Sequence, residues 1–360
     1  MKHSIQSKRY KVVHVTTELS KYCIGGIGTV LDSLYENRNQ DELFVFVHPD
    51  GMQKNFYEFD DDVIVMSISE FLDIHNPLPF EADTVYVHNY NLFEMHRFDK
   101  STKLIYVIHS LIPVEMTFVN TYGDREEKNF WKAVNIADEL VVVSNSEKST
   151  LEKIMGNVGY SPKKITVIYN GVSQQEIIKK DYNMKNGVIG YIGRLDYRKG
   201  VFQSVKEWKD IEDFKLILAC GGVGSFPPYY SNKLSNTIES YAKNKVFPIG
   251  LVSNERKKDF FRKVDALIVP SLYEPFGMTV VEGIVNGLPI LATRYGGVKE
   301  ILGKDYPLYF DPCKKGDLKR VIALYKSMSS IEIRKLVERN IERVSLFSEE
   351  IMISKYRGET

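Results

Sequence analysis

Residues 266–291 read ALIVPSLYEPFGMTVVEGIVNGLPIL, and the rest of the chain is organised around them. The apolar residues 266–269 predict a buried strand, and the prolines at 270 and 275 keep the next segment out of regular structure. An apolar helix is expected to begin near Met278. A strand, a loop and a helix in this order are typical of a parallel α/β unit, in which ligands bind beyond the carboxyl end of the strand.

Two carboxylates lie at opposite ends of this passage from loop to helix. Glu274 falls in the loop, whereas Glu282 falls in the first turns of the expected helix, so we expect the two to have different roles. The backbone N–H groups where the loop becomes a helix form a ready anion site between them. They belong to Phe276, Gly277, Met278 and Thr279. Because a carboxylate accepts hydrogen bonds from vicinal hydroxyls, the arrangement suits a diphosphate flanked by two polyols.

The run from Pro270 to Gly283, followed by NGLPILAT at 286–293 and GGVKE at 296–300, resembles the donor-site signature of family-4 retaining glycosyltransferases. This resemblance implies a GT-B fold, in which two doubly wound, Rossmann-like α/β domains face each other across a cleft. It also implies that a nucleotide sugar places sugar hydroxyls near Glu274 and ribose hydroxyls near Glu282. An isolated Glu-x7-Glu is more often an accidental spacing, but the complete run favours the donor site.

The bulk composition is that of an ordinary globular protein of about two domains. The chain has 360 residues, of which 43% are hydrophobic and 26% charged, and its net charge of +1 gives no electrostatic argument for nucleic acid. No run approaches the roughly 20 apolar residues of a membrane span, and the start lacks the apolar centre of a signal peptide. We therefore expect a cytoplasmic protein, and peripheral contact with the inner face of the membrane stays open.

Short apolar runs along the first half predict strands that are buried on both faces, as in a parallel sheet. They are residues 10–16, 43–47, 63–68, 84–87, 104–108, 140–143 and 165–168. Helices are expected between several of them, at 29–36, 128–136 and 147–155. We predict one doubly wound domain over residues 1–170 and a linker over 171–186, which is polar and lacks a clear period.

The second half repeats this alternation of apolar runs and helices. Strands are expected at residues 187–192, 215–219, 246–250, 266–269 and 289–292, and late helices at 317–327 and 331–343. We predict a second domain over residues 187–345, which would hold the donor, and a tail over 346–360. The family architecture implies that this tail packs back on the first domain.

A glycine-rich loop follows the first predicted strand. Gly25 and Gly26 would let backbone N–H groups approach a phosphate or a sugar, although a simple tight turn is an equally good interpretation of two glycines. With Glu18 and Lys21, the loop resembles, with one extra residue in the spacing, the N-terminal loop of glycogen and starch synthases. The resemblance makes Lys21 a candidate donor contact.

His109 follows the predicted strand 104–108, at the edge where parallel sheets place their ligands. A histidine at a strand end is structural about as often as it is functional. The segment resembles the strand-end His-Asn-Leu of glycogen synthases, with serine in place of asparagine, and this implies contact with the donor sugar near the reacting carbon.

The loop after residues 187–192 contains Arg194 and Lys199. Cations in a loop are usually solvated, but a planar guanidinium and a mobile ammonium together suit two bridged phosphates. Their Arg-x4-Lys spacing resembles the diphosphate clamp of these transferases. With this clamp in place, the donor reaction needs no metal and no cofactor.

Nothing else in the sequence predicts a metal site. Asp60, Asp61 and Asp62 precede a strand rather than follow one, which favours a solvated turn over the Asp-x-Asp metal site of other sugar transferases. The seven histidines lack a ligand spacing with a third partner. Cys23, Cys220 and Cys313 lie far apart and fit reduced thiols.

The resemblance implies transfer of a hexosyl unit from a UDP-, ADP- or GDP-sugar to an acceptor hydroxyl, with retention at the anomeric carbon. The likeness to glycogen synthases favours glucose. The acceptor stays open among a saccharide, a lipid-linked saccharide, a small molecule and a protein. Two alternatives also stay open: a GT-B-type phosphorylase or sugar-nucleotide epimerase, and a non-catalytic subunit that assists a partner transferase.

Overall fold

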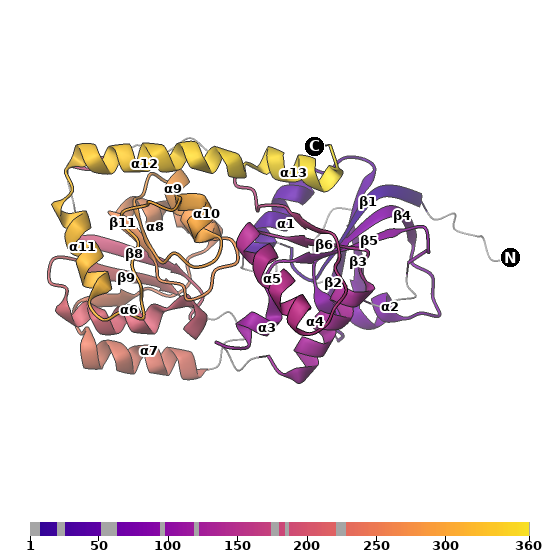
Figure 1. Cartoon of the computed structure of the whole chain (residues 1–360), viewed down its shortest axis with the longest axis horizontal. Helices are drawn as coiled ribbons and strands as arrows, with labels where there is room; N and C mark the ends of the chain where they lie inside the picture. The colour runs from indigo at the N-terminus through magenta and orange to yellow at the C-terminus, as the bar shows by residue number, and fades with distance from the viewer. Residues whose placement is uncertain are drawn as a thin grey trace. The chain divides into compact units, whose positions relative to one another are not determined.

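The computed structural model describes residues 8–19, 26–51, 63–93, 98–118, 122–173, 180–183, 187–220 and 228–359. The chain divides into two compact units, and each is built on a parallel sheet with helices packed against it (Figure 1). Unit 1 comprises Met1–Gly171 and Glu350–Thr360, and unit 2 comprises Val172–Glu349. The C-terminal segment therefore belongs to the same unit as the N-terminal half of the chain.

Unit 1 contains a seven-stranded sheet in the order β3-β2-β1-β4-β5-β6-β7, and all neighbouring strands run parallel. The strands are β1 (Lys8–Thr16), β2 (Glu42–His48), β3 (Val63–Ser67), β4 (Phe80–Val87), β5 (Lys103–Ile108), β6 (Glu139–Val142) and β7 (Ile165–Val167). Each apolar run that predicted a strand in this half forms one. The prediction holds because strands covered by helices on both faces need continuous apolar sequence.

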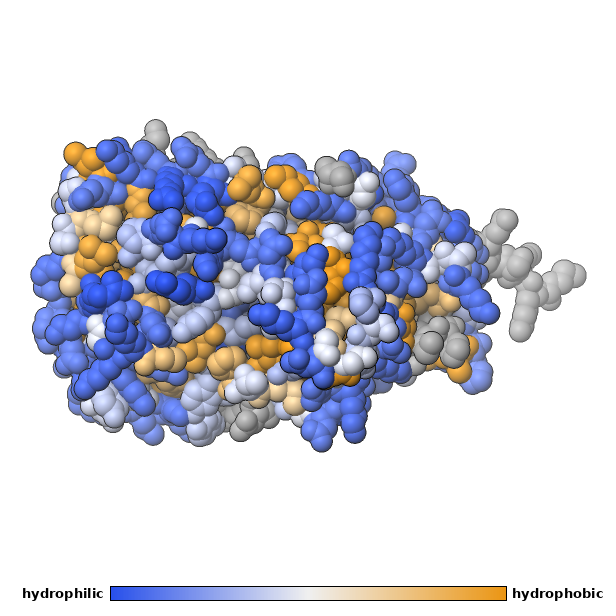
Figure 2. Space-filling view, viewed as in Figure 1, coloured by the Kyte–Doolittle hydropathy of each residue, from blue (hydrophilic) through white to orange (hydrophobic). Residues whose placement is uncertain are grey.

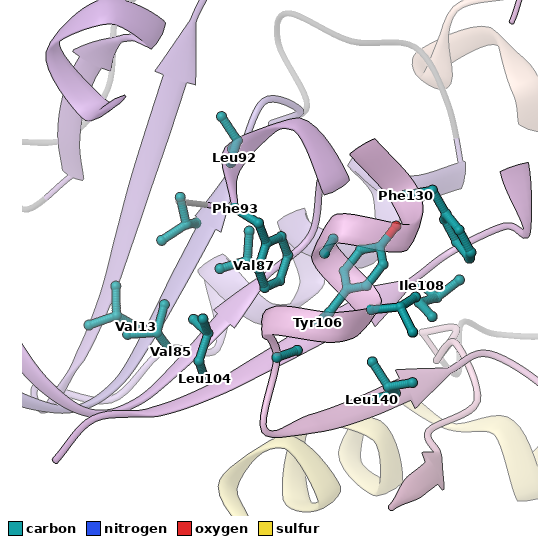
Figure 3. Close-up of a cluster of buried hydrophobic side chains, with 14 of the residues drawn as sticks. Val13, Val85, Val87, Leu92, Phe93, Leu104, Tyr106, Ile108, Phe130 and Leu140 are labelled. Carbon is teal, nitrogen blue, oxygen red and sulfur yellow. The ribbon is translucent and has the colours of Figure 1, made fainter. Parts of the chain in front are cut away.

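The helices of unit 1 are α1 (Gly26–Glu36), α2 (Ile68–Leu72), α3 (Ile112–Glu115), α4 (Asp124–Ile136), α5 (Asn145–Asn157) and α13 (Glu349–Arg357). Figure 3 shows part of the core, in which Val85, Val87 and Leu104 of the central strands belong to one buried cluster with Phe93 and Tyr106. Phe130 of α4 and Leu140 of β6 belong to the same buried cluster. The strands β1, β4 and β5 that contribute to this core are neighbours in the sheet, so their carboxyl ends lie at the same edge.

The start of α1 differs from the sequence-based expectation. The helix begins at Gly26 rather than near Thr29, so Gly26 and the buried Gly28 lie in its first turn instead of in the preceding loop. Gly25 and Lys21 lie outside the described residues.

Unit 2 contains a five-stranded parallel sheet in the order β10-β9-β8-β11-β12. Its strands are β8 (Val188–Gly193), β9 (Lys215–Cys220), β10 (Val246–Pro248), β11 (Ala266–Val269) and β12 (Ile290–Ala292). Its helices are α6 (Val201–Glu207), α7 (Pro228–Tyr241), α8 (Asn254–Lys263), α9 (Met278–Val285), α10 (Val298–Leu302), α11 (Asp317–Ser327) and α12 (Ser330–Val344). The five strands predicted for this half all form.

The strand order of unit 2 reverses beside β8. From β8 the chain continues to β9 and β10 on one side, then returns to β11 and β12 on the other. In an open parallel sheet, the loops that leave the carboxyl ends of the strands at such a reversal diverge and leave room for a ligand. The loops after β8 and β11, which carry the candidate site residues, meet at this point.

Part of the predicted linker is held by unit 2. Lys180 donates through Nζ to the carbonyl oxygen of Phe261 at 2.7 Å and to that of Val264 at the end of α8, and the Tyr182 hydroxyl donates to the Gly287 carbonyl at 2.7 Å. The Lys180 ammonium thus binds backbone carbonyls that the end of a helix leaves unpaired. Residues 180–183 are anchored, whereas the sequence indicated only a polar segment.

Hydrophilic residues predominate on the face of the molecule that Figure 2 shows, and hydrophobic side chains appear there in separate areas. Within the described ranges, no helix combines the length and the apolar character that crossing a bilayer requires.

Candidate donor site

Three loops meet at the carboxyl edge of the unit 2 sheet: residues 194–200 after β8, residues 270–277 after β11 and residues 293–297 after β12. The Leu272 amide donates to the Arg198 carbonyl at 2.7 Å and joins the first two loops. The Thr293 hydroxyl donates to the Ser271 carbonyl at 2.6 Å, and the Gly297 amide donates to the Glu274 carbonyl at 3.0 Å. The loops therefore form one connected surface.

Two glycines let these loops approach each other closely. A Cβ on Gly200 would lie 1.9 Å from the Pro270 carbonyl oxygen, and a Cβ on Gly296 would lie 1.9 Å from that of Glu274. Both glycines also adopt positive φ, +66° and +63°. Any larger residue would push the loop 270–277 away from its neighbours.

Glu274 is nearly buried and is held by two other side chains. Lys199 donates through Nζ to Oε2 of Glu274 at 2.7 Å, and the Ser271 hydroxyl donates to the same oxygen at 2.8 Å. Neither bond uses Oε1. The carboxylate is thus fixed in orientation by the first two loops while one oxygen remains for a further donor such as a sugar hydroxyl.

Arg194 and Arg198 of the β8 loop have different environments. Arg198 is buried, with Nη2 3.6 Å from Oδ2 of Asp196, whereas 46% of the Arg194 side chain is exposed and its Nε lies 3.8 Å from the same oxygen. Burial raises the pKa of Asp196, and the charges of Arg194 and Lys199 oppose this shift. Asp196 also caps the short 3-10 helix Tyr197–Lys199 by accepting from the Lys199 amide at 3.1 Å. Arg194 is therefore the guanidinium of this pair that can reach a ligand.

The N-terminus of α9 opens directly after the Glu274 loop. Gly277 is the residue before the helix and has φ of +118°, a value that side chains disfavour. Its carbonyl accepts from the Val280 amide at 2.9 Å, so the first-turn amides of Met278 and Thr279 point outward from the helix without intrahelical acceptors. This end of the helix, together with Phe276, is suited to an anion.

Glu282 lies further along α9 and has a lysine partner. Its Oε1 accepts from Nζ of Lys257 in α8 at 2.8 Å, and the two side chains are 17% and 23% exposed. The sequence pattern does not single out Lys257, because it precedes Glu282 by 25 residues and is one of several cations in α8. Ser271 lies in the loop that the sequence singles out, but the sequence does not predict its hydrogen bond to Glu274.

His109 lies in unit 1, directly after β5, and belongs to a row of three histidines. Its Nε2 is 2.9 Å from Nδ1 of His88, and Nε2 of His88 is 3.0 Å from Nδ1 of His14. Burial lowers the pKa of His14 and of His109 to about 4, and it lowers that of His88 well below its usual value. All three rings are neutral at pH 7. The sequence pointed to His109 but not to this row.

The remaining predicted residues of the site cannot be placed. Lys21 and Gly25 lie outside the described residues, and so do the aspartates 60–62 of the metal alternative. Within the part of the chain that is described, no three His, Cys, Asp or Glu side chains gather in a way that could hold a metal ion.

Two family models match the sequence. Residues 173–343 match the model of glycosyl transferases group 1, and residues 64–176 match that of glycosyltransferase family 4. An uncharacterized glycosyltransferase of Methanocaldococcus jannaschii is 31% identical over 214 residues, which cover 59% of this chain and 55% of that protein. Mannosylfructose-phosphate synthase of Agrobacterium fabrum is 29% identical over 40% of this chain, and the match spans 34% of its own length.

Solved structures share the fold over nearly the whole chain. Sucrose-phosphate synthase from Thermosynechococcus elongatus superimposes with a TM-score of 0.76 at 16% identity, covering 96% of this chain and 97% of that one. HepE from Anabaena, in complex with UDP and glucose, gives a TM-score of 0.74 at 17% identity, covering 97% and 98%. Because both family models match and each unit has a Rossmann-like sheet, this chain belongs to the group 1 glycosyltransferases of family 4 and has the GT-B fold.

Proposed function

We propose that the protein transfers a hexosyl unit, with glucose favoured, from a nucleoside diphosphate sugar to an acceptor hydroxyl, with retention at the anomeric carbon. The observation that carries this proposal is the fixed Glu274 carboxylate beside the N-terminus of α9, with Lys199 bonded to it and the exposed Arg194 in the same loop. Carboxylate, cations and helix N-terminus together offer complementary groups for a sugar and a diphosphate.

The cationic groups act on the leaving diphosphate. As the bond between sugar and diphosphate breaks, negative charge grows on the phosphate oxygens, and Arg194, Lys199 and the first amides of α9 stabilise it. Because these groups are fixed before the reaction, little reorganisation is needed when the charge develops. The same charges make a divalent metal unnecessary.

The carboxylates act on the two ends of the donor. Glu274 accepts hydrogen bonds from sugar hydroxyls through Oε1, since Lys199 and Ser271 already bind Oε2. Glu282 accepts from the ribose hydroxyls, and Lys257 holds its other oxygen. His109 of unit 1 contacts the donor sugar near the reacting carbon, a role that rests on the resemblance of its segment to glycogen synthases.

In the proposed reaction the acceptor hydroxyl gives its proton to the leaving diphosphate and not to a side chain. No described residue of the site is placed as a covalent nucleophile on the sugar. In the proposed reaction the acceptor oxygen attacks from the face that the diphosphate leaves, the bond from anomeric carbon to phosphate oxygen breaks, and the departing diphosphate takes the acceptor proton.

Glucose and UDP are the favoured donor parts. The support comes from the likeness to glycogen synthases and from the related fold of Anabaena HepE, which has been solved with UDP-glucose. Acceptors differ widely among the relatives, which include a 2-deoxystreptamine glucosyltransferase of Streptomyces kanamyceticus and a glycosyltransferase of Campylobacter jejuni that acts on a diphospho-undecaprenol-linked sugar. The acceptors tested therefore need to include saccharides, lipid-linked saccharides and small molecules.

A donor panel tests the proposal. The protein is first screened against UDP-, ADP- and GDP-sugars by thermal shift, where a ligand at about 100 times its Kd adds roughly 2.7 kcal/mol of stability. The best donor is then incubated with candidate acceptors, and released nucleoside diphosphate and the anomeric configuration of the product are measured. Glu274→Ala is the negative control.

The alternatives give different products. A phosphorylase requires inorganic phosphate and yields a sugar phosphate, an epimerase converts the nucleotide sugar without releasing nucleoside diphosphate, and a non-catalytic subunit binds nucleotide without turnover. Any of these outcomes, or an inverted product, contradicts the proposal.

A further inference from the structure

The row of His14, His88 and His109 runs across three neighbouring strands of unit 1. His14 is on β1, opposite Tyr86 of β4, and His88 and His109 follow the ends of β4 and β5. Successive residues of a strand point to opposite faces, so the register places all three rings on the same face of the sheet. Ring centroids are 5.3 Å apart for His14 and His88 and 5.2 Å apart for His88 and His109.

The row is tightly packed at the end formed by His14, its inner end. His14 and His88 are 2% and 3% exposed. The His14 ring stacks between Phe44 at 4.9 Å and Tyr86 at 5.2 Å, and the edge of Tyr356 packs against it at 5.6 Å. The rings have little freedom to turn, so the two contacts between ring nitrogens are built into the fold.

These contacts couple the protonation sites of the three rings. A neutral imidazole has one N–H and one lone pair, and each contact needs one of each. Suppose that His88 carries its hydrogen on Nε2. It then donates to Nδ1 of His14, so the hydrogen of His14 must be on Nε2. Nδ1 of His88 is a lone pair that accepts from His109, so the hydrogen of His109 is also on Nε2. If His88 carries its hydrogen on Nδ1, the same reasoning puts a hydrogen on Nδ1 of all three. The rings share one tautomer.

The surroundings of His109, at the outer end of the row, favour one of these two tautomers. Nδ1 of His109 is buried and makes no hydrogen bond within the described part of the chain. A buried N–H without a partner is rarer and more costly than a bare acceptor. The state with hydrogen on Nε2 leaves Nδ1 of His109 as a lone pair and puts the free N–H on Nε2 of His14, which is not among the described buried atoms that lack a hydrogen-bond partner. The other state leaves a buried, unpaired N–H on Nδ1 of His109.

We propose that His14 and His88 are positioning residues for His109: the three imidazoles share the Nε2–H tautomer, and His109 thereby offers Nδ1 as a hydrogen-bond acceptor to a substrate hydroxyl. Only the substrate part rests on the proposed function. Each ring that donates to the next polarises the row, which strengthens Nδ1 of His109 as an acceptor. A hydroxyl near the reacting carbon would thus be held by an acceptor of fixed direction.

Nitrogen NMR of the wild-type protein labelled with ¹⁵N-histidine tests the shared tautomer without any activity assay. The couplings of ring protons to the two nitrogens distinguish Nε2–H from Nδ1–H, and the single variants His14→Phe, His88→Phe and His109→Asn assign the signals. We expect Nε2–H for all three residues in the free protein. A mixed set, or Nδ1–H on His109, overturns the proposal.

Variants test the coupling along the row. His88→Phe keeps an aromatic ring but removes both nitrogens, so we expect the His109 signals to shift toward those of an averaging tautomer. We expect His14→Phe to shift the His109 signals as well, although these two residues share no bond. Tyr86→Phe is the matched control, because it alters the ring beside His14 and leaves the row intact. Unchanged His109 signals in His14→Phe contradict the proposal.

Turnover gives the second readout. If the best donor from the panel is processed, His88→Phe is expected to lower kcat roughly two- to tenfold, the equivalent of one net hydrogen bond, and to leave the affinity for free nucleoside diphosphate unchanged. An equal fall in nucleotide affinity contradicts a positioning role at the sugar. If no nucleotide sugar is turned over, the proposed function fails, and the NMR result still decides the tautomer.

Discussion

Nζ of Lys199 lies 2.7 Å from Oε2 of Glu274, and the two side chains are only 16% and 11% exposed. The partners come from different loops, one after β8 and the other after β11, so the ion pair joins the cationic part of the candidate site to its carboxylate. Because one N–H of Lys199 already binds Glu274, the lysine can bind a diphosphate only through its other N–H groups. The ammonium has three N–H groups, which is enough to bind both at once.

Removing one partner of this pair should cost stability. Lys199→Met leaves Glu274 as a nearly buried charge without its ammonium, and we expect a loss of about 3 kcal/mol in the free energy of unfolding. Lys199→Met combined with Glu274→Leu should recover part of that loss. Lys243→Met is the control: its pair with Glu239 is 65% exposed on both sides, and the expected change is within about 0.5 kcal/mol. Chemical denaturation measures the wild type and the three variants. A loss for Lys199→Met as small as that of the control contradicts the expectation.

Gly296 should tolerate no side chain. Gly296→Ala would place a methyl group 1.9 Å from the Glu274 carbonyl oxygen at φ of +63°, so we expect it to displace the Glu274 loop and abolish turnover. Gly316→Ala is the matched control, with φ of +82° and open space around the new methyl group. It should cost only the backbone strain, about 1 kcal/mol, and keep activity. Equal thermal stability and turnover in the two variants would show that the close approach has no role.

The sequence predicted the strands better than the contacts between side chains. Strands such as residues 104–108 are predictable because burial on both faces leaves a continuous apolar run. The Lys257–Glu282 pair is not, since it depends on how α8 packs beside α9. The same holds for His14 and His88, which are 74 residues apart and meet only because β1 lies beside β4 in the sheet.

In the candidate site, too, local features are predictable from the sequence and side-chain contacts are not. Glu274 could be found because its loop, with two prolines and a following helix, is a local feature of the sequence. The bond from Ser271 that fixes it depends on a side-chain rotamer, about which the sequence pattern says nothing. The sequence predicts the start of α1 too late, near Thr29, because glycine has a low helix propensity, whereas Gly26 and Gly28 lie within the described helix.

Glu274→Ala and Glu282→Ala should fail in different ways. Glu282→Ala is expected to weaken binding of free UDP by about tenfold, the equivalent of roughly 1.4 kcal/mol for lost ribose hydrogen bonds. Glu274→Ala should keep UDP affinity within about threefold and lower turnover strongly, because it acts on the sugar. Calorimetry with UDP and steady-state kinetics separate the two effects. Glu338→Ala, on the exposed side of α12, is the control, and equal losses of UDP affinity in the two site variants would contradict this division of roles.

Chelation should leave activity unchanged. If Arg194, Lys199 and the N-terminus of α9 stabilise the leaving diphosphate, a divalent cation has no charge left to neutralise. We expect the rate with EDTA in excess over trace metal to equal the untreated rate, when the released nucleoside diphosphate is separated and measured directly. Complete loss with EDTA and recovery with Mn²⁺ would favour metal binding by the aspartates at 60–62 and contradict the proposed charge stabilisation.

The buried histidines should make the protein sensitive to mild acid. Burial lowers the pKa of His14 to about 4, whereas an unfolded histidine titrates near 6.5. Between these values the unfolded chain binds more protons than the folded one, so stability is retained above pH 6.5 and falls as the pH drops toward 4. Each such histidine contributes a slope of up to about 1.4 kcal/mol per pH unit.

Replacing His14 should therefore flatten this acid dependence. We expect His14→Phe, which cannot take up a proton, to lose free energy of unfolding less steeply than the wild type between pH 6.5 and 4, whatever its stability at pH 7. His75→Phe is the control, because His75 is exposed and its replacement leaves the buried row unchanged. Denaturant unfolding at several pH values measures the slopes. Parallel curves for the wild type and His14→Phe would mean that His14 binds its proton equally well in the folded and unfolded chains.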